Sequence, residues 1–197
     1  MPERADAAGP GLIRIIGLGN ELLSDDGLGI SVVRQLRQRL PGGAIEFEEL
    51  SVGGLELLDH ITGCERIIIV DAIATGVHPP GTVLRFLQTS EIDPVTLTSS
   101  HQIDLSQVLT LARLLGGDVP RTVLVYGIEA QDSVTFHDEC TEDVRRAIPI
   151  LVDTICADIA GGRTAVTPGV WQIVSDAVPD RYTTEHTWHI PPMISRV

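Results

Sequence analysis

Apolar residues along the chain form short β-branched runs that alternate with segments where they recur every three or four positions. The first run lies at residues 12–16 and stops at Gly17 and Gly19, as expected for a buried strand that leaves its sheet through a tight turn. Valine and leucine then repeat at helical spacing as far as Leu40, with arginines between them, and predict an amphipathic helix. Ser24 is its expected N-cap, which places two acidic residues in the first turn.

The same two patterns continue along the chain and predict the rest of the fold. Strands alternate with helices, which predicts a three-layer α/β/α sandwich around a central, mostly parallel, twisted sheet. We expect Pro149 to bend or split the last helix, because proline removes a backbone N–H group. The predicted strands are 44–50, 66–72, 82–88 and 121–130, and the predicted helices are 55–61, 105–115 and 141–159.

The length of 197 residues suits one domain with a core of its own. Residues 1–10 are polar and read as a disordered leader, and residues 11–162 form the single α/β domain. Residues 163–197 contain both tryptophans and several prolines without a reliable period, so we expect an extended or disordered C-terminal extension.

Charge and cysteine content narrow the function classes. The formal net charge of −13 argues against a nucleic-acid partner or an anionic membrane surface. No apolar stretch is long enough to insert into a membrane, and the first residues lack the apolar core of a secretion signal. The three cysteines are widely spaced, which argues against a disulfide framework or a thiolate zinc site. These features predict a cytoplasmic protein.

Three residues stand out as candidates for chemistry. Asp26 follows the first strand, Asp71 ends the apolar run 67–70, and His101 precedes the helix predicted from residue 105. Each has an ordinary explanation as a helix-start or loop residue. Because the carboxyl ends of parallel strands share one edge of a sheet, the three can also converge there. They would then form a metal site with oxygen and nitrogen ligands, or carry out acid–base catalysis without metal. We expect Asp25 to have a capping or supporting role.

Four segments extend this interpretation to a known family. The segments are GLGNELLSDDGLG at 17–29, IIIVDAI at 67–73, SSHQIDL at 99–105 and VYGIEA at 125–130. Together, in order and spacing over residues 12–160, they resemble the nickel–iron hydrogenase maturation endopeptidases.

The resemblance implies a protease that removes the C-terminal extension of the hydrogenase large-subunit precursor once nickel has been inserted. It implies that Asp26, Asp71 and His101 contact the nickel, where the family commonly has Glu and sometimes Asp at the first position. We expect the same three residues to be catalytic, with either the nickel acting as a Lewis acid or a carboxylate activating water. The nickel is carried by the precursor, and another divalent metal can substitute in the isolated protein. Many relatives have a Gly-x-x-Leu-Ser pattern before the last helix, whereas this chain has residues 137–141, His-Asp-Glu-Cys-Thr. We expect a monomer, because the precursor has to reach the edge of the sheet.

Three other classes of protein share part of this pattern. A metal-sensing maturation chaperone would bind the precursor through the same three side chains without cleaving it. A nucleotide-binding protein is disfavoured, because the loop at residues 17–22 lacks the third glycine of a dinucleotide fingerprint and has no phosphate-binding lysine. A general metal-dependent peptidase would cleave unrelated peptides.

Overall fold

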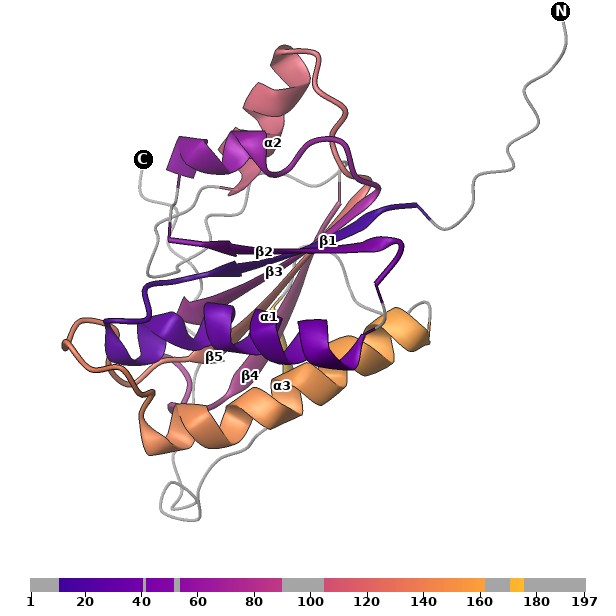
Figure 1. Cartoon of the computed structure of the whole chain (residues 1–197). Coiled ribbons are helices and arrows are strands. Elements are labelled where there is room, and N and C mark those ends of the chain that lie inside the picture. Colours follow the sequence, from indigo (N-terminus) through magenta and orange to yellow (C-terminus); the bar gives the residue numbers. More distant parts are fainter. Residues whose placement is uncertain (1–10, 41, 52–53, 90–104, 162–170, 176–197) are drawn as a thin grey trace, which may run out of the picture.

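The computed structural model describes residues 11–40, 42–51, 54–89, 105–161 and 171–175. Their centre is a six-stranded sheet with the order β2-β1-β3-β5-β4-β6 (Figure 1). Strands β2, β1, β3 and β5 are parallel, whereas β4 is antiparallel to both β5 and β6. The strands span Ile13–Leu18 (β1), Ile45–Leu50 (β2), Arg66–Ile73 (β3), Val83–Thr89 (β4), Thr122–Glu129 (β5) and Gln172–Ser175 (β6).

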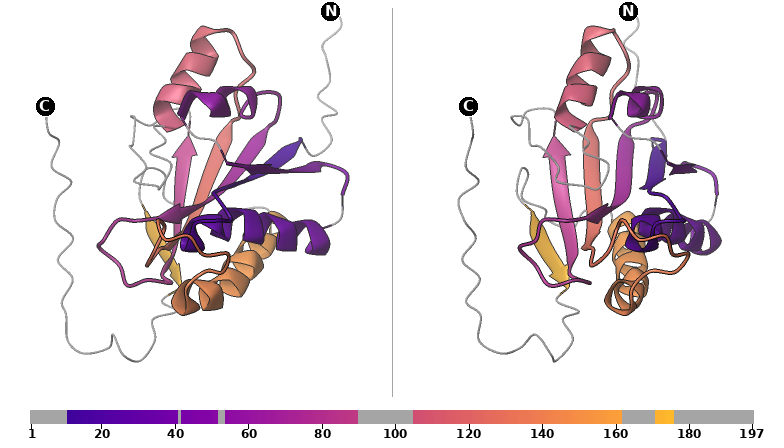
Figure 2. Two further views of the ribbon diagram at one scale, coloured as in Figure 1. Left: turned by 60° about the vertical axis from the view of Figure 1, so that its left-hand side comes forward. Right: turned by 90° about the vertical axis from the view of Figure 1, so that its left-hand side faces the viewer.

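Helices cover both faces of the sheet, which confirms the predicted three-layer α/β architecture. Helices α1 (Leu28–Arg39) and α3 (Glu142–Ala160) lie side by side on one face. Helix α2 (Leu105–Leu114) and the 3-10 helix η2 (Gly54–Asp59) lie on the other (Figures 1 and 2). No helix in the described ranges is long and apolar enough to cross a membrane.

Strand β3 shows why an unbroken apolar run forms the middle of such a sheet. Side chains alternate between the two faces of a strand, so a strand covered on both sides must be apolar at every position. Ile68 and Val70 pack into the core beneath α1 and α3, whereas Ile67 and Ile69 pack into the core beneath α2 and η2. All four side chains are at most 2% exposed.

Helix α3 is not split at Pro149, so that part of the expectation is wrong. Proline leaves the carbonyl of Arg145 without its usual helical partner. Both residues lie on the exposed face of α3, where water can solvate that carbonyl. The opposite face is buried against the sheet through Ile148, Leu151 and Val152, and this packing stabilises the continuous helix.

Residues 172–175 of the C-terminal segment add the edge strand β6 to the sheet. A buried polar cluster lies beside it, in which Arg85 on β4 donates to the Asp158 carboxylate at 2.8 Å and to the Gln172 side-chain oxygen at 3.2 Å. The Tyr126 hydroxyl also donates to Asp158. Burial and this carboxylate raise the pKa of Tyr126, so the phenol stays protonated. The neighbouring Trp171 ring packs on Phe86 with centroids 5.3 Å apart.

Candidate active site

The carboxyl ends of β1, β3 and β5 form one edge of the sheet, because these strands are neighbours and parallel. Ligand sites of α/β proteins are found at this kind of edge. The chain leaves β1 through Gly19, whose φ of +145° is a conformation that glycine adopts readily. It then forms the 3-10 helix η1 (Ser24–Gly27) and continues directly into α1.

A close backbone contact holds the start of α1 on this edge. A Cβ atom at Gly29 would lie 2.2 Å from the carbonyl oxygen of Leu18 and 2.5 Å from that of Val70. Only glycine fits this contact, which seats the first turn of α1 on the ends of β1 and β3. Consequently η1, which contains Asp26, lies against β3, which contains Asp71.

Asp26 is 4% exposed, and its carboxylate accepts a hydrogen bond from the backbone N–H of Asn20 at 2.8 Å. The Asn20 side-chain oxygen in turn accepts the N–H of Leu22 at 3.0 Å. The loop between β1 and η1 therefore folds around the Asp26 carboxylate and fixes its position at the edge.

Asp71 is 2% exposed and lies two residues before the end of β3, opposite Gly127 of β5. One of its carboxylate oxygens accepts the backbone N–H of Ala72 at 2.8 Å. Asp26 and Asp71 thus belong to the same sheet edge, as the sequence predicted for parallel strands. Burial removes bulk water from the two carboxylates and strengthens their attraction for a cation.

His101, the third predicted site residue, lies outside the described residues. In the part of the chain that the structure describes, no group of three or more His, Cys, Asp or Glu side chains is arranged to hold a metal ion. Asp26 and Asp71 are the described candidates for metal ligands, and their oxygen donors are of the type that divalent cations bind.

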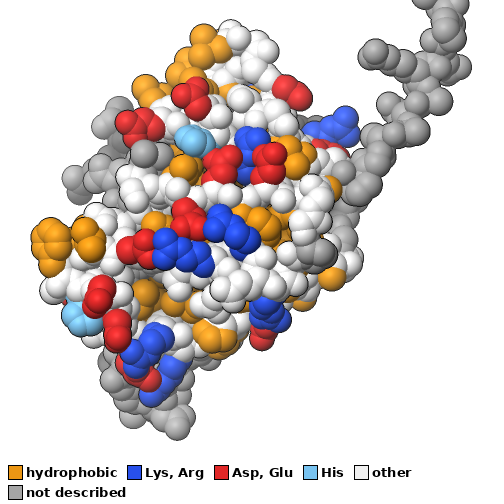
Figure 3. All heavy atoms as spheres, in the orientation of Figure 1, with side chains coloured by type: hydrophobic (Ala, Val, Ile, Leu, Met, Phe, Trp, Pro, Cys, Tyr) orange, Lys and Arg blue, Asp and Glu red, His pale blue; other side chains and the backbone are white. Residues whose placement is uncertain are grey.

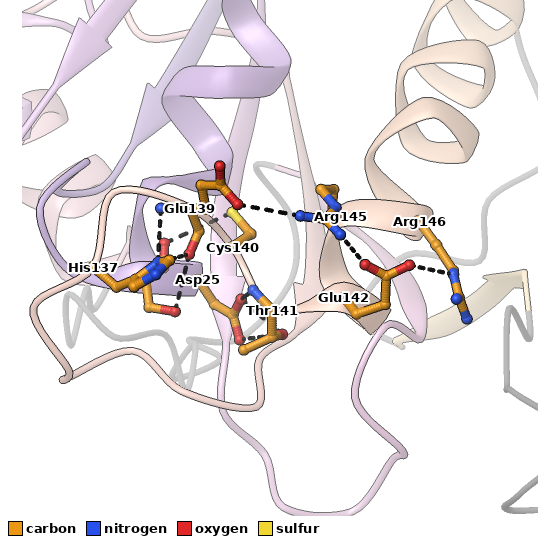
Figure 4. Close-up of polar contacts among 9 residues, drawn as sticks. Asp25, His137, Glu139, Cys140, Thr141, Glu142, Arg145 and Arg146 are labelled. Carbon is orange, nitrogen blue, oxygen red and sulfur yellow. Dashed lines mark hydrogen bonds and ion pairs between the residues drawn. The ribbon is translucent and has the colours of Figure 1, made fainter.

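Asp25 has a role that differs from helix capping (Figure 4). Its side chain is fully buried and accepts hydrogen bonds from the backbone N–H groups of Gln131 and Asp132, both at 2.9 Å. It also accepts the backbone N–H of Thr141 at 2.7 Å and the Thr141 hydroxyl at 2.9 Å. Asp25 therefore joins η1 to both ends of the loop at 131–141.

The prediction that Ser24 caps the helix is wrong. Ser24 lies inside η1 with a φ of +45°, and its hydroxyl donates to the carbonyl oxygen of Glu139 at 3.3 Å. Thr141 is the N-cap residue of α3, but its hydroxyl is bonded to Asp25 rather than to the helix. Both hydroxyls are used in contacts between segments more than a hundred residues apart in the sequence.

Glu129 at the end of β5 is a buried acid at this edge that the sequence analysis missed. Its carboxylate accepts the Thr75 hydroxyl and the Gly76 N–H, both at 2.7 Å, and so holds the loop after β3. Burial raises the pKa of Glu129, although these two hydrogen bonds act in the opposite direction. A carboxylate ending a buried strand is the signal that singled out Asp71, and it applied equally to Glu129.

Cys140 is the cysteine near η1, with its sulfur 3.7 Å from the carbonyl oxygen of Ser24. Burial, together with the nearby Asp25 carboxylate, raises the pKa of this thiol to about 11. The thiolate is the nucleophilic form of cysteine, so the shift disfavours Cys140 as a nucleophile at neutral pH.

A groove of about 440 Å³ lies between α1 and the start of α3, next to η1. Ser31 and Gln35 line it from α1, and Cys140 and Ile148 line it from the other side. Acidic and basic side chains surround these residues, namely Glu21, Asp138, Glu139, Arg34 and Arg145.

Comparison with known proteins identifies the family. Residues 30–158 match the family described as "Hydrogenase maturation protease". The chain belongs to this family. The Hydrogenase 2 maturation protease of Escherichia coli (strain K12) is 31% identical over 150 residues, which cover 74% of this chain and 88% of that protein.

Solved structures of hydrogenase maturation proteases share the fold. The hydrogenase maturating endopeptidase HybD from E. coli has a TM-score of 0.63 and 26% identity, covering 77% of this chain and 93% of that one. The [NiFe] hydrogenase maturation protease HybD from Thermococcus kodakarensis has a TM-score of 0.56 and 26% identity, covering 76% and 99%. This hydrogenase maturation protease therefore carries Asp26 and Asp71 on a fold that the family shares.

Proposed function

We propose that this hydrogenase maturation protease removes the C-terminal extension of a nickel–iron hydrogenase large-subunit precursor after nickel has been inserted. The observation that carries the proposal is the placement of two buried carboxylates, Asp26 and Asp71, at one edge of the sheet in a member of this family. We further infer that it acts in the cytoplasm as a monomer.

Asp26, Asp71 and His101 bind the nickel that the precursor presents. Two carboxylates and an imidazole are a ligand set that nickel accepts in proteins. A precursor without nickel lacks these bonds and is left uncleaved. The metal is part of the substrate, and a second divalent ion can take its place on the isolated protein.

Hydrolysis adds a water molecule across one peptide bond of the precursor. The water oxygen bonds to the carbonyl carbon, the C–N bond breaks, and a water proton ends on the leaving amine. Nickel can polarise the carbonyl or the water, and alternatively a carboxylate accepts the water proton as a general base. Under the second mechanism Asp26 or Asp71 carries the proton to the amine.

The test mixes the purified protein with its large-subunit precursor, nickel-loaded or nickel-free, and follows the precursor by mass spectrometry. We expect loss of a C-terminal peptide from the nickel-loaded form alone. The Asp26→Asn, Asp71→Asn and His101→Ala variants should each lose processing, whereas Asp59→Asn, an exposed aspartate on η2, should retain it.

Two results would contradict the proposal. If the precursor binds without a change in mass, the protein is a chaperone rather than a protease for this substrate. If all three site variants process the precursor at the wild-type rate, the site is elsewhere.

A further inference from the structure

Three large apolar side chains protrude beside the candidate active site. Leu22, Val134 and Phe136 are 61%, 78% and 81% exposed. Figure 3 shows hydrophobic side chains protruding at the left edge of the molecule, where Figure 1 places the loop at 131–141. We call these three residues the apolar patch. Exposed apolar clusters of this kind mark interaction sites more often than single exposed residues do.

Hydrogen bonds fix the two segments that carry the apolar patch to each other. The backbone N–H of His137 donates to the carbonyl oxygen of Leu22 at 3.0 Å, and the N–H of Ser24 donates to the carbonyl oxygen of His137 at 2.8 Å. The buried Asp25 carboxylate holds both ends of the loop at 131–141. A surface that is already ordered loses little conformational entropy when a partner binds.

The apolar patch continues into the candidate active site. Leu22 lies in the loop that folds around the Asp26 carboxylate. Asn20 links the two residues, because its backbone N–H donates to Asp26 and its side-chain oxygen accepts the N–H of Leu22. A substrate whose scissile bond reaches Asp26 therefore passes next to Leu22. Val134 and Phe136 lie in the loop at 131–141, whose residue His137 donates its backbone N–H to the carbonyl oxygen of Leu22.

The groove beside the apolar patch has an acidic excess. Arg34 is paired with Glu21 and Glu49, and Arg145 is paired with Glu139 and Glu142. The Asp138 carboxylate at the groove has no ion pair within the described residues. The groove therefore favours a cationic side chain on whatever binds there.

We infer that the apolar patch, with the acidic groove next to it, is the docking surface for the large-subunit precursor. We expect the precursor segment that docks there to have apolar side chains that contact Val134 and Phe136. We also expect it to have a basic side chain that binds in the groove. The inference rests on the proposed function and adds to it a second contact, separate from the nickel ligands. Docking there directs the precursor's scissile bond toward Asp26.

The test is a paired substitution that leaves the buried residues untouched. Val134→Ser/Phe136→Ser removes both protruding side chains, and Leu114→Ser/Leu115→Ser is the matched control. The control residues are 79% and 67% exposed and lie at the end of α2, on the opposite face of the sheet. Processing of the nickel-loaded precursor gives kcat and KM, and biolayer interferometry gives Kd.

We expect the patch variant to raise KM and Kd at least about tenfold, the effect of losing an interface hot spot, with a much smaller change in kcat. The control variant should stay within about twofold of the wild type. A patch variant with wild-type KM and Kd overturns the docking inference. If that variant instead converts a dimer into monomers at unchanged KM, the apolar patch is a contact between copies of this chain, which also overturns it.

Failure of the proposed function gives a different result. In that case the wild-type protein itself leaves the precursor uncleaved, whatever the state of the apolar patch. The Asp26→Asn variant separates the two roles in the same assay, because it should lose processing and still bind the precursor through the apolar patch.

Discussion

Replacing Asp25 with Asn tests whether a single buried carboxylate organises the active-site loop. The substitution keeps the size of the side chain but turns one acceptor oxygen into an NH2 group. One oxygen of Asp25 accepts the N–H groups of Gln131 and Asp132, and the other accepts the N–H of Thr141. Whichever way the amide is oriented, at least one of these backbone N–H groups then faces another donor.

The expected loss of stability in Asp25→Asn follows from the charge and the burial of the Asp25 side chain. A hydrogen bond to a charged group contributes about 1.5–3 kcal/mol, and a buried donor without an acceptor costs about 1–3 kcal/mol. We therefore expect Asp25→Asn to lower the free energy of unfolding by about 2–4 kcal/mol. Asp138→Asn, an exposed carboxylate in the same loop, should change it by about 0.5 kcal/mol or less.

Urea denaturation followed by circular dichroism measures the free energy of unfolding, and amide hydrogen exchange locates the effect. The amides of Gln131, Asp132 and Thr141 should exchange faster in Asp25→Asn, with smaller changes in the sheet. Equal stability and equal protection of these amides in both variants would refute the role assigned to Asp25.

Three further predictions follow from buried contacts. Gly29→Ala should lower the free energy of unfolding by about 1–3 kcal/mol, measured by thermal denaturation, because the new methyl group meets backbone oxygen. Gly42→Ala, where a Cβ meets nothing within 4 Å, is its control. Arg85→Met should lower the free energy of unfolding by about 3–5 kcal/mol, measured by urea denaturation, because it removes the guanidinium paired with the buried Asp158 carboxylate. A decrease below about 1 kcal/mol would contradict this. At pH 8 Cys140 should react with iodoacetamide roughly a hundredfold more slowly in the folded than in the unfolded protein. The reason is that a thiol pKa of about 11 leaves far less thiolate at this pH than the usual value of about 8.5. Equal labelling rates of Cys140 in the folded and the unfolded protein, measured by peptide mapping, would contradict the raised pKa.

Most of the fold could be predicted because local pattern and burial agree. The run of β-branched residues in β3 is apolar at every position for a physical reason, since both of its faces are covered. The same logic placed Asp71 at the carboxyl edge. Residues 172–175 could not be recognised as a strand, because β6 has four residues and its position depends on pairing with β4.

The errors at the candidate site have one physical cause. Ser24 has a side chain suited to helix capping, so a local rule assigned it that role, and the same rule would assign it to Thr141. Each hydroxyl instead bonds to a segment 115 or 116 residues away in the chain. Local sequence carries no information on which distant donor or acceptor competes for a hydroxyl. The Asp25 hydrogen bonds were missed for the same reason.

The edge strand β6 has a consequence for any shortened form of this protein. The family match ends at residue 158, so trimming the chain there looks harmless from alignment alone. Such a cut would remove Gln172 and the rest of β6, and with them the partner that covers the outer edge of β4. Bare strand edges recruit other strands and promote aggregation. The oligomeric state and solubility of a truncated protein would then report the exposed edge of β4 rather than the behaviour of the intact enzyme.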